Sequence, residues 1–409
     1  MPQTSNNSSI VQSLIFSTMK KLSLFALTAA VLLACSTDEP IQQMDASNLE
    51  AYAQTNGPAI IPGKYIIVFK EDRSFSGLGS KLRGKAEGIL KKYGGKASDI
   101  EFVYANSIQG FSAFLPPGLY KKIAEDIEVL YVEEDKEIKL TQRGNKGGGG
   151  TTTQPAQEIP WGIARVGGAG NGVGKTAWII DTGIHLTHPD LTVNATKGFS
   201  AFTKGKDSGM NDGNGHGTHV AGTVAALNNS IGVVGVAAGA TVVPIKVLGA
   251  TGSGTTSGVI AGVDHVAARA AIGDVANMSL GGGISSALDQ AVINAAAKGI
   301  KFALAAGNEA TSATNSSPGR ANGANIYTVS AHNISDVFAS FSNFGNPPVD
   351  FCAPGVSIKS TWLAGGYNTI SGTSMATPHV CGILLLGPVN TRGFVTGDKD
   401  TTPDPLASR

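Results

Sequence analysis

Apolar strand-like runs alternate with helical runs through the second half of this 409-residue chain, and this alternation limits the possible folds more than any other feature. Strands that are apolar along their whole length indicate a sheet buried on both faces, and helices between them indicate parallel connections. We therefore predict an α/β fold in which helices cover both faces of a parallel sheet. The expected strands are 177–180, 241–247, 275–278 and 301–304, and the expected helices are 216–227, 257–268 and 286–298.

A smaller α+β unit is predicted ahead of this sheet. Runs rich in β-branched and aromatic residues surround two helical patterns, in the order strand, helix, strand, strand, helix, strand. This order is typical of a ferredoxin-like domain. The strands are expected at 64–70, 101–104, 111–115 and 129–133, with helices at 80–93 and from Pro117 to Glu125. A glycine- and threonine-rich stretch, 144–158, follows and indicates a flexible, protease-sensitive linker.

The composition indicates a globular protein with more than one domain. Apolar residues make up 42% and charged residues 15%, with 54 glycines that suit tight turns and close packing. The net charge of +1 gives no electrostatic basis for binding nucleic acid. Three cysteines are too few for a disulfide-rich scaffold.

The N-terminal region has the pattern of an export signal. Lys20 and Lys21 precede a short apolar run, 22–33, and Ala34 stands before Cys35. This order is typical of a secretory signal peptide, and the run is too short to span a bilayer. Cys35 resembles the acylated cysteine of bacterial lipoproteins. We expect a signal region at 1–34 that starts at Met19, a tether at 35–61, and a protein lipid-anchored to the cell envelope or surface, or released after processing.

Three polar residues supply the groups that covalent amide hydrolysis needs: a nucleophile, a base and an acid that orients the base. Asp181 ends a predicted strand in DTGI, His216 opens a helix in GHGTHVAGT, and Ser374 opens a helix in SGTSMATPHV. A helix N-terminus also favours developing negative charge. The three motifs together predict Asp181, His216 and Ser374 as catalytic residues.

Two other kinds of motif in the sequence suggest metal or nucleotide binding. The pairs His185/His188 and His216/His219 have H-x-x-H spacing, but no third ligand follows, so a packing role is favoured for the histidines outside the catalytic motif. The glycine-rich segment 170–176 lacks the first glycine of a phosphate loop, because Ala169 stands there, and it precedes its strand. Nucleotide binding is therefore excluded.

Residues 62–388 resemble the subtilase family of serine endopeptidases, in its proteinase K-like branch, on these three motifs and on the PWG at 160–162. The resemblance implies protein or peptide substrates, an acyl-enzyme mechanism without a required cofactor, and Asn308 as an oxyanion donor beside the Ser374 N–H. GFSAFL at 110–115 and YVEED at 131–135 are similar to the inhibitory propeptide of the family, which the enzyme removes itself. A structural calcium at Asp350 is also implied.

Substrate binding is expected at two segments similar to the recognition strands of the family and at small residues that would leave a roomy apolar slot. Broad cleavage after apolar or aromatic residues follows from this expectation. These residues are Gly252, Ser253, Gly254, Ser279, Leu280, Gly281, Gly282, Ala305, Ala306 and Gly307.

The resulting domain plan places an inhibitory propeptide at 62–140, a processing linker at 141–158, a catalytic domain at 159–388 and a polar tail at 389–409. We expect a monomer whose only link to the membrane is its lipid. Cys352 and Cys381 could form a disulfide or remain two buried thiols, and the sequence leaves both open. Two alternative functions also stay open: a catalytically silent surface-anchored binding protein, and a peptide ligase or cyclase that uses the same nucleophile.

Overall fold

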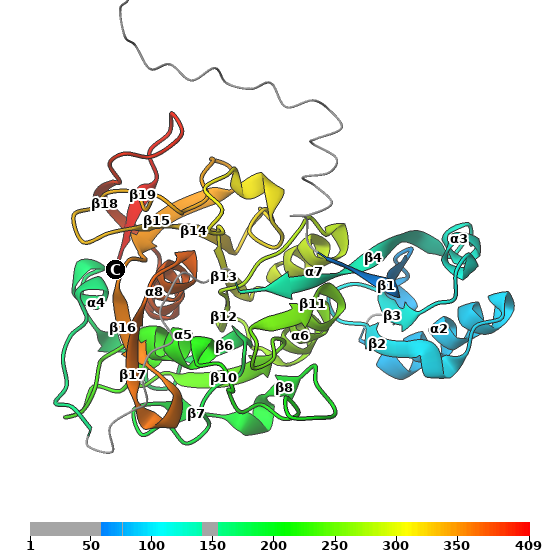
Figure 1. Ribbon diagram of the computed structural model, residues 1–409, viewed down its shortest axis with the longest axis horizontal. Coiled ribbons are helices and arrows are strands. Elements are labelled where there is room, and N and C mark those ends of the chain that lie inside the picture. Colours follow the sequence, from blue (N-terminus) through cyan, green and yellow to red (C-terminus); the bar gives the residue numbers. More distant parts are fainter. Residues whose placement is uncertain (1–58, 76, 141–153) are drawn as a thin grey trace, which may run out of the picture. The chain divides into compact units, whose positions relative to one another are not determined.

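Strand β6 (Thr176–Asp181), which ends at the predicted catalytic aspartate, lies inside a large sheet in the computed structural model (Figure 1). The structure describes residues 59–75, 77–140 and 154–409. The predicted signal region, Cys35, most of the tether and the linker up to residue 153 lie outside the described residues.

Within the described residues, ten strands form this sheet, in the order β18-β19-β15-β14-β13-β12-β6-β10-β7, with β8 also paired to β10. All neighbouring pairs are parallel except β18 with β19, so the α/β fold is confirmed. The strands besides β6 are β7 (Thr192–Val193), β8 (Phe199–Ser200), β10 (Thr241–Lys246), β12 (Val275–Met278), β13 (Lys301–Ala305), β14 (Ile326–His332), β15 (Val349–Pro354), β18 (Asn390–Phe394) and β19 (Pro405–Ser408).

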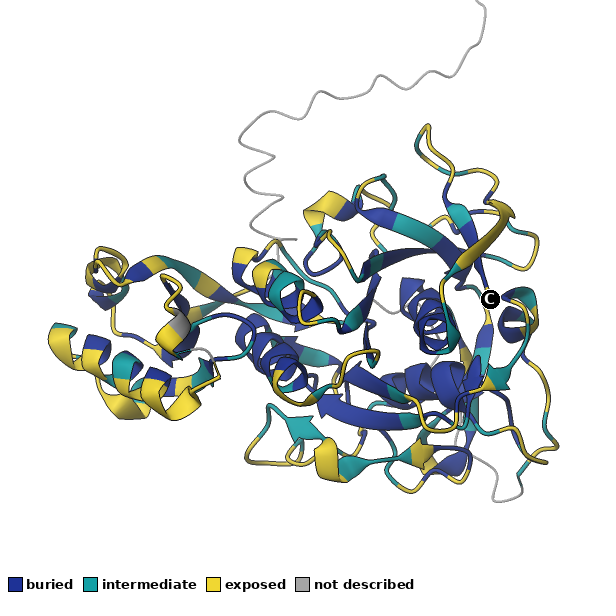
Figure 2. Ribbon diagram, turned by 180° about the vertical axis from the view of Figure 1, so that it is seen from behind, coloured by how far each residue is buried: buried dark blue, intermediate teal, exposed yellow. Residues whose placement is uncertain are grey.

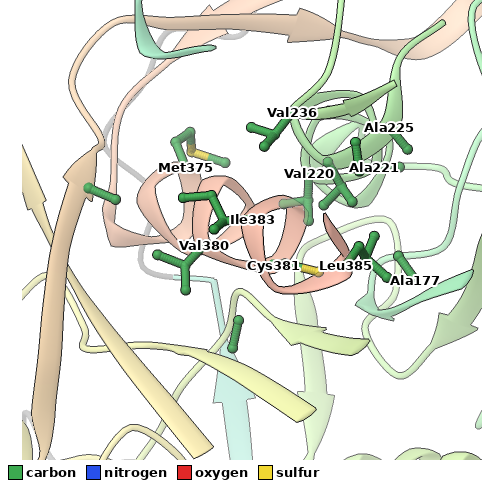
Figure 3. Packing of buried hydrophobic residues seen from close by; sticks show 14 of the residues in the cluster. Ala177, Val220, Ala221, Ala225, Val236, Met375, Val380, Cys381, Ile383 and Leu385 are labelled. Carbon is green, nitrogen blue, oxygen red and sulfur yellow. The ribbon is translucent and has the colours of Figure 1, made fainter. Parts of the chain in front are cut away.

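Helices cover both faces of the sheet because the buried strands present apolar side chains in both directions. Ala177 and Ile179 of β6 pack in one core with α5 (His216–Ala225) and α8 (Thr373–Leu386). The alternate residues, Trp178 and Ile180, pack in a second core with α6 (Thr256–Arg269) and α7 (Ser286–Ala296). Figure 3 shows the first core, in which Cys381 and Leu385 of α8 lie on the side of Val220 of α5. In Figure 2, α5 and α8 are almost wholly buried.

Shorter elements connect this framework. Strands β16 (Ile358–Thr361) and β17 (Tyr367–Ile370) form an antiparallel hairpin, and β5 (Gly170–Asn171) pairs with β9 (Ala237–Ala238). The remaining short helices are α4 (Trp161–Arg165), η1 (Arg73–Phe75), η2 (Ala97–Asp99), η3 (Ala195–Lys197), η4 (Ala313–Asn315) and η5 (Leu363–Gly365).

The predicted ferredoxin-like order is confirmed in the first part of the described chain. Its elements are β1 (Ile60–Phe69), α2 (Gly79–Tyr93), β2 (Ile100–Tyr104), β3 (Gly110–Phe114), α3 (Leu119–Ala124) and β4 (Val129–Lys139). Leu82, Ala86, Ile89 and Leu90 of α2 pack against this antiparallel sheet in a core of their own. Strand β4 continues to Lys139, well past its expected end at Glu133, and pairs there with β11 (Ser253–Thr255).

The C-terminal segment corrects the prediction of a polar tail at 389–409. Residues 390–408 form the β18–β19 hairpin, and β19 pairs with β15 at the edge of the main sheet. Val395, Leu406 and Ala407 are buried, the first two beside Phe338 and Cys352. The polar composition of 389–409 gives no strand signal, because the few apolar residues of β18 and β19 are separated by a long loop.

Both cysteines in the described residues are buried free thiols, so no disulfide joins Cys352 to Cys381. Cys352 lies on β15 under the hairpin, whereas Cys381 lies on α8 in the first core.

Candidate active site

Asp181 and His216 form a buried pair where β6 ends and α5 begins. His216 Nδ1 lies 2.8 Å from Asp181 Oδ1 and 3.0 Å from Oδ2, and both side chains are almost fully shielded from solvent. When Nδ1 carries the proton it donates to the carboxylate, and Nε2 is left as a proton acceptor. Nε2 has no hydrogen-bond partner among the described residues. The pair therefore has the arrangement of a general base with its orienting acid.

Glycine is required beside His216 because the backbone of the aspartate turn approaches closely. A Cβ on Gly217 would lie 2.1 Å from the Gly183 carbonyl oxygen and 3.2 Å from Asp181 Cβ. Gly215, on the other side, has φ of +105°, a left-handed conformation that L side chains rarely adopt. The glycines of the GHG motif thus allow α5 to start in contact with the end of β6.

Asp212, which sequence analysis missed, ties the two motifs together. Its buried carboxylate accepts hydrogen bonds from the Thr182 hydroxyl (2.9 Å) and from the N–H groups of Asn214 (2.8 Å), Gly215 (2.9 Å) and Thr218 (3.0 Å). The Thr218 hydroxyl also donates, at 2.6 Å. Asp212 therefore fixes the turn after Asp181 and the entry to the His216 helix at once. A single aspartate in a glycine-rich loop gives no sequence signal for this role.

Ser374 lies in the first turn of α8, which packs against α5. Its side chain is 5% exposed, and its hydroxyl donates to the Ser279 carbonyl at 3.0 Å. The Ser279 hydroxyl in turn donates to the Ser374 carbonyl at 2.8 Å and accepts a hydrogen bond from the Asn277 amide at 2.9 Å. The end of β12 thereby sets the position of the serine.

Asn308 follows β13 and reaches the residue before Ser374. Its Oδ1 accepts the Thr373 N–H at 2.8 Å and the Thr373 hydroxyl at 3.0 Å. Asn343 holds the same turn by accepting the N–H groups of Glu309 and Thr311 and by donating to the Ala306 carbonyl. The structure therefore brings the segments around Asp181, Ser279, Asn308 and Ser374 together at the carboxyl ends of neighbouring strands, where ligands bind in such sheets.

The two predicted recognition segments hold the end of β4 between them. Lys139 pairs with Ser253, Ile138 with Gly254 and Glu137 with Thr255, all antiparallel. The Leu140 N–H donates to the Gly252 carbonyl at 2.9 Å, and an isolated bridge joins Lys139 to Gly281. A Cβ on Gly282 would lie 3.1 Å from Ile138 Cγ1. These segments thus bind an extended chain by main-chain pairing.

The other residues predicted for this region are buried or closely packed. Leu280 is buried in the same core as Ile138. Ala305 and Ala306 end β13 as buried residues, and a Cβ on Gly307 would lie 2.2 Å from Asn343 Nδ2, which excludes larger residues there.

Hydrogen bonds to two aspartates also join the N-terminal unit to α6. Asp135 accepts the Ser257 N–H at 3.0 Å and the Ser257 hydroxyl at 2.6 Å, at the start of α6, and Lys64 Nζ lies 3.1 Å from it. Asp264, later in α6, accepts the N–H groups of Asn106 and Ser107, both at 2.7 Å. Charge-assisted bonds of this kind are the stronger ones in proteins.

The second histidine of each H-x-x-H pair is buried and hydrogen-bonded to a backbone carbonyl. His219 Nε2 lies 2.9 Å from the Ile358 carbonyl, and burial lowers the pKa of His219 to about 3. His188 Nε2 lies 3.1 Å from the Gly366 carbonyl, and burial lowers its pKa to about 4.

The predicted calcium residue, Asp350, accepts the Thr328 N–H at 2.8 Å, and burial raises its pKa to about 6. In the described part of the chain, no three His, Cys, Asp or Glu side chains converge into a metal-binding group. A calcium ion at Asp350 would therefore depend on backbone carbonyls for most of its ligands.

Comparison with known proteins decides the family. The family model described as "Subtilase family" matches residues 174–387. The chain belongs to the subtilase family. It is a serine-type endopeptidase of that family, and the model described as "Peptidase inhibitor I9" matches residues 64–141 ahead of the protease. In the described residues, no helix combines the length and apolar character needed to cross a membrane.

Relatives match most of this subtilase. "Extracellular serine proteinase" of Thermus sp. (strain Rt41A) is 38% identical over 372 residues, 87% of each chain. "Subtilisin E" of Bacillus subtilis (strain 168) is 40% identical over 344 residues, 82% of each. "Alkaline serine exoprotease A" of Vibrio alginolyticus is 40% identical over 338 residues, which are 80% of this chain and 60% of that protein. A crystal structure of a cold adapted subtilisin-like serine proteinase matches with TM-score 0.51 and 46% identity, over 55% of this chain and 83% of the other.

Proposed function

We propose that this subtilase hydrolyses peptide bonds through Ser374 as nucleophile, His216 as base and Asp181 as the acid that orients it. The single observation that carries the proposal is the buried Asp181–His216 pair, which leaves Nε2 ready to accept a proton. As Ser374 Oγ attacks the substrate carbonyl carbon, its proton passes to Nε2 and the carbonyl π electrons move to oxygen. Collapse expels the amine, which takes that proton. Water then attacks the acyl ester by the same route and restores Ser374.

The negative oxygen of this step would be stabilised by the Asn308 amide and the Ser374 N–H. The contact between Asn308 Oδ1 and Thr373 supports this proposal, because it holds the amide next to the serine turn. Loss of one such donor typically reduces turnover by about 10²–10³-fold. The chemistry needs no cofactor, and a calcium ion at Asp350 would serve stability only.

The I9 unit is proposed to act as an intramolecular inhibitor that the enzyme removes within 141–158. The end of β4 supports this role, since it occupies the two recognition segments as an extended peptide. Main-chain pairing tolerates most side chains. We therefore propose broad specificity with a preference for apolar or aromatic residues.

We further propose that the protein belongs to the proteinase K-like branch and is exported, lipid-anchored at Cys35 and monomeric. The PWG at 160–162 supports the branch, and the signal-like N-terminus that ends at Cys35 supports export and the lipid anchor. Labelling with a radioactive fatty acid, compared between the full chain and Cys35→Ala, tests the anchor directly.

The first test is the intact mass of the full chain beside Ser374→Ala. The wild type should lose its I9 unit by a cut in 141–158, and the variant should remain full length. Ser208→Ala, an exposed serine in a loop, is the matched control and should process like the wild type. A Ser374→Ala chain that still processes itself would contradict the proposed nucleophile. A panel of fluorogenic peptides then measures the preference.

A further inference from the structure

The C-terminal hairpin holds a group of buried oxygens that neither the catalytic site nor the family accounts for. Asn346 Oδ1, Asp400 Oδ2 and Asp404 Oδ1 are each shielded from solvent and have no hydrogen-bond partner among the described residues. Leaving a buried acceptor unpaired is costly, and more so for a carboxylate. Three such oxygens in one place therefore require an explanation.

In each of the three side chains, the other polar atom already makes a hydrogen bond. Asp400 Oδ1 accepts the Thr402 N–H at 2.7 Å, and Asn346 Nδ2 donates to the Thr402 carbonyl at 3.1 Å. The second oxygen of Asp404, Oδ2, accepts the Ser330 hydroxyl. These bonds fix each side chain and leave one oxygen apiece available.

The three side chains are neighbours. Asn346 and Asp400 both bond the backbone of Thr402, which lies two residues before the fully buried Asp404 (0% exposed). Among the described residues, Asp398, Asp400 and Asp404 form no ion pair. Lys399, between them in sequence, instead donates to the Ser340 carbonyl.

Asp398 does not belong to the ligand set. Its Oδ1 accepts the Lys399 N–H at 2.7 Å and its Oδ2 accepts the Asp404 N–H at 3.0 Å. The available set is thus two carboxylate oxygens and one amide oxygen, which are hard ligands that suit calcium and leave room for carbonyls or water to complete the shell.

We propose that Asn346, Asp400 and Asp404 bind a divalent cation of the calcium class that fastens the C-terminal hairpin to the loop before β15. The ion would join residues 398–404, between β18 and β19, to the segment that leads into β15, the strand on which β19 pairs. This site is separate from the calcium site predicted at Asp350 and does not depend on the catalytic proposal.

The test uses the full-length Ser374→Ala chain, freed of metal by a chelator and then given calcium alone. Hydrogen exchange of residues 390–408 should slow by about tenfold at 1 mM calcium, because protection scales as 1 + [L]/Kd and extracellular sites have Kd of about 0.1 mM. Calorimetric titration should show one more calcium bound than in the Asp400→Asn and Asp404→Asn variants, each made in the same Ser374→Ala chain.

Two controls separate this site from other effects. Asp398→Asn, an aspartate of the same loop outside the ligand set, should keep the response, as should Asp350→Asn. Should Asp404→Asn fail to fold, Asp400→Asn still decides, because Asp400 is only partly buried. The competing explanation is a proton shared at Asp404. Exchange in 390–408 that depends on pH but ignores calcium, or that Asp400→Asn leaves calcium-sensitive, would overturn the proposal.

Discussion

Replacement of Asp212 by alanine should reduce the free energy of unfolding more than replacement of any other non-catalytic carboxylate residue in the site. The substitution leaves three buried N–H groups and two hydroxyls without their acceptor. Each unsatisfied buried donor costs about 1–3 kcal/mol, and hydroxyls can rotate to other partners. At the lower half of this range, the three N–H groups alone imply a loss of about 3–6 kcal/mol, which is large for one substitution.

The assay is thermal unfolding in the Ser374→Ala chain, which prevents self-digestion. For domains of this size, each kcal/mol shifts Tm by about 2–4 °C, so Asp212→Ala should lower it by about 10 °C. Asp212→Asn keeps one acceptor oxygen but places an NH₂ group opposite the donors that bonded the other oxygen. Its Tm should therefore fall by about half as much. Asp207→Asn, whose carboxylate accepts one N–H from Ala250, is the matched control and should shift Tm by less than about 2 °C.

A Tm for Asp212→Ala within 2 °C of its parent would refute this reasoning, because water would then have replaced the carboxylate. Activity provides a second measurement. In the chain with Ser374 intact, turnover by Asp212→Ala should fall even at temperatures where it is folded, since the Asp181 turn and the His216 helix would no longer share a support.

Three further predictions follow from buried charges and thiols. Lys246→Met should lower Tm by several degrees, because the buried Lys246 Nζ donates to the Thr182 carbonyl at 2.6 Å and to the Leu248 carbonyl at 3.1 Å; an unchanged melt would contradict this. Burial raises the pKa of Asp289 to about 6, so the folded state holds its proton more tightly than the unfolded state and stability from this group falls as pH rises from about 4 through 6. Asp289→Asn should therefore gain Tm relative to its parent at pH 7.5 but not at pH 4.5, and an equal effect at both would exclude the linkage. Burial also raises the pKa of both the Cys352 and Cys381 thiols, so a maleimide should label them only after unfolding, as read by peptide mapping.

The sequence was sufficient for those elements whose signal is local. Apolar strands such as β12 and the amphipathic helix α2 were predicted within a residue, because burial on two faces or one stripe leaves a distinct periodicity. The contact between Asp181 and His216 could also be predicted, because their motifs place both residues where a strand or turn meets a helix.

The features that could not be predicted from the sequence depend on contacts between segments that are distant in the chain. β19 has four residues and gains its stability from pairing with β15, more than fifty positions earlier, so the hairpin was mistaken for a polar tail. Asp212, Asp135 and Asp264 are ordinary surface residues by type, and only the donors that the fold gathers around them reveal their roles.

The bonds between Asp135 of the I9 unit and Ser257 of α6, and between Asp264 of α6 and the I9 unit, involve no residue of the 141–158 linker. A cut in that linker would therefore sever the covalent connection without releasing any of these contacts. Processing and activation then become two separate events in time. A preparation of freshly cleaved molecules would begin silent and show a lag, and the lag would shorten with enzyme concentration if one liberated protease digests the inhibitor still held by its neighbours.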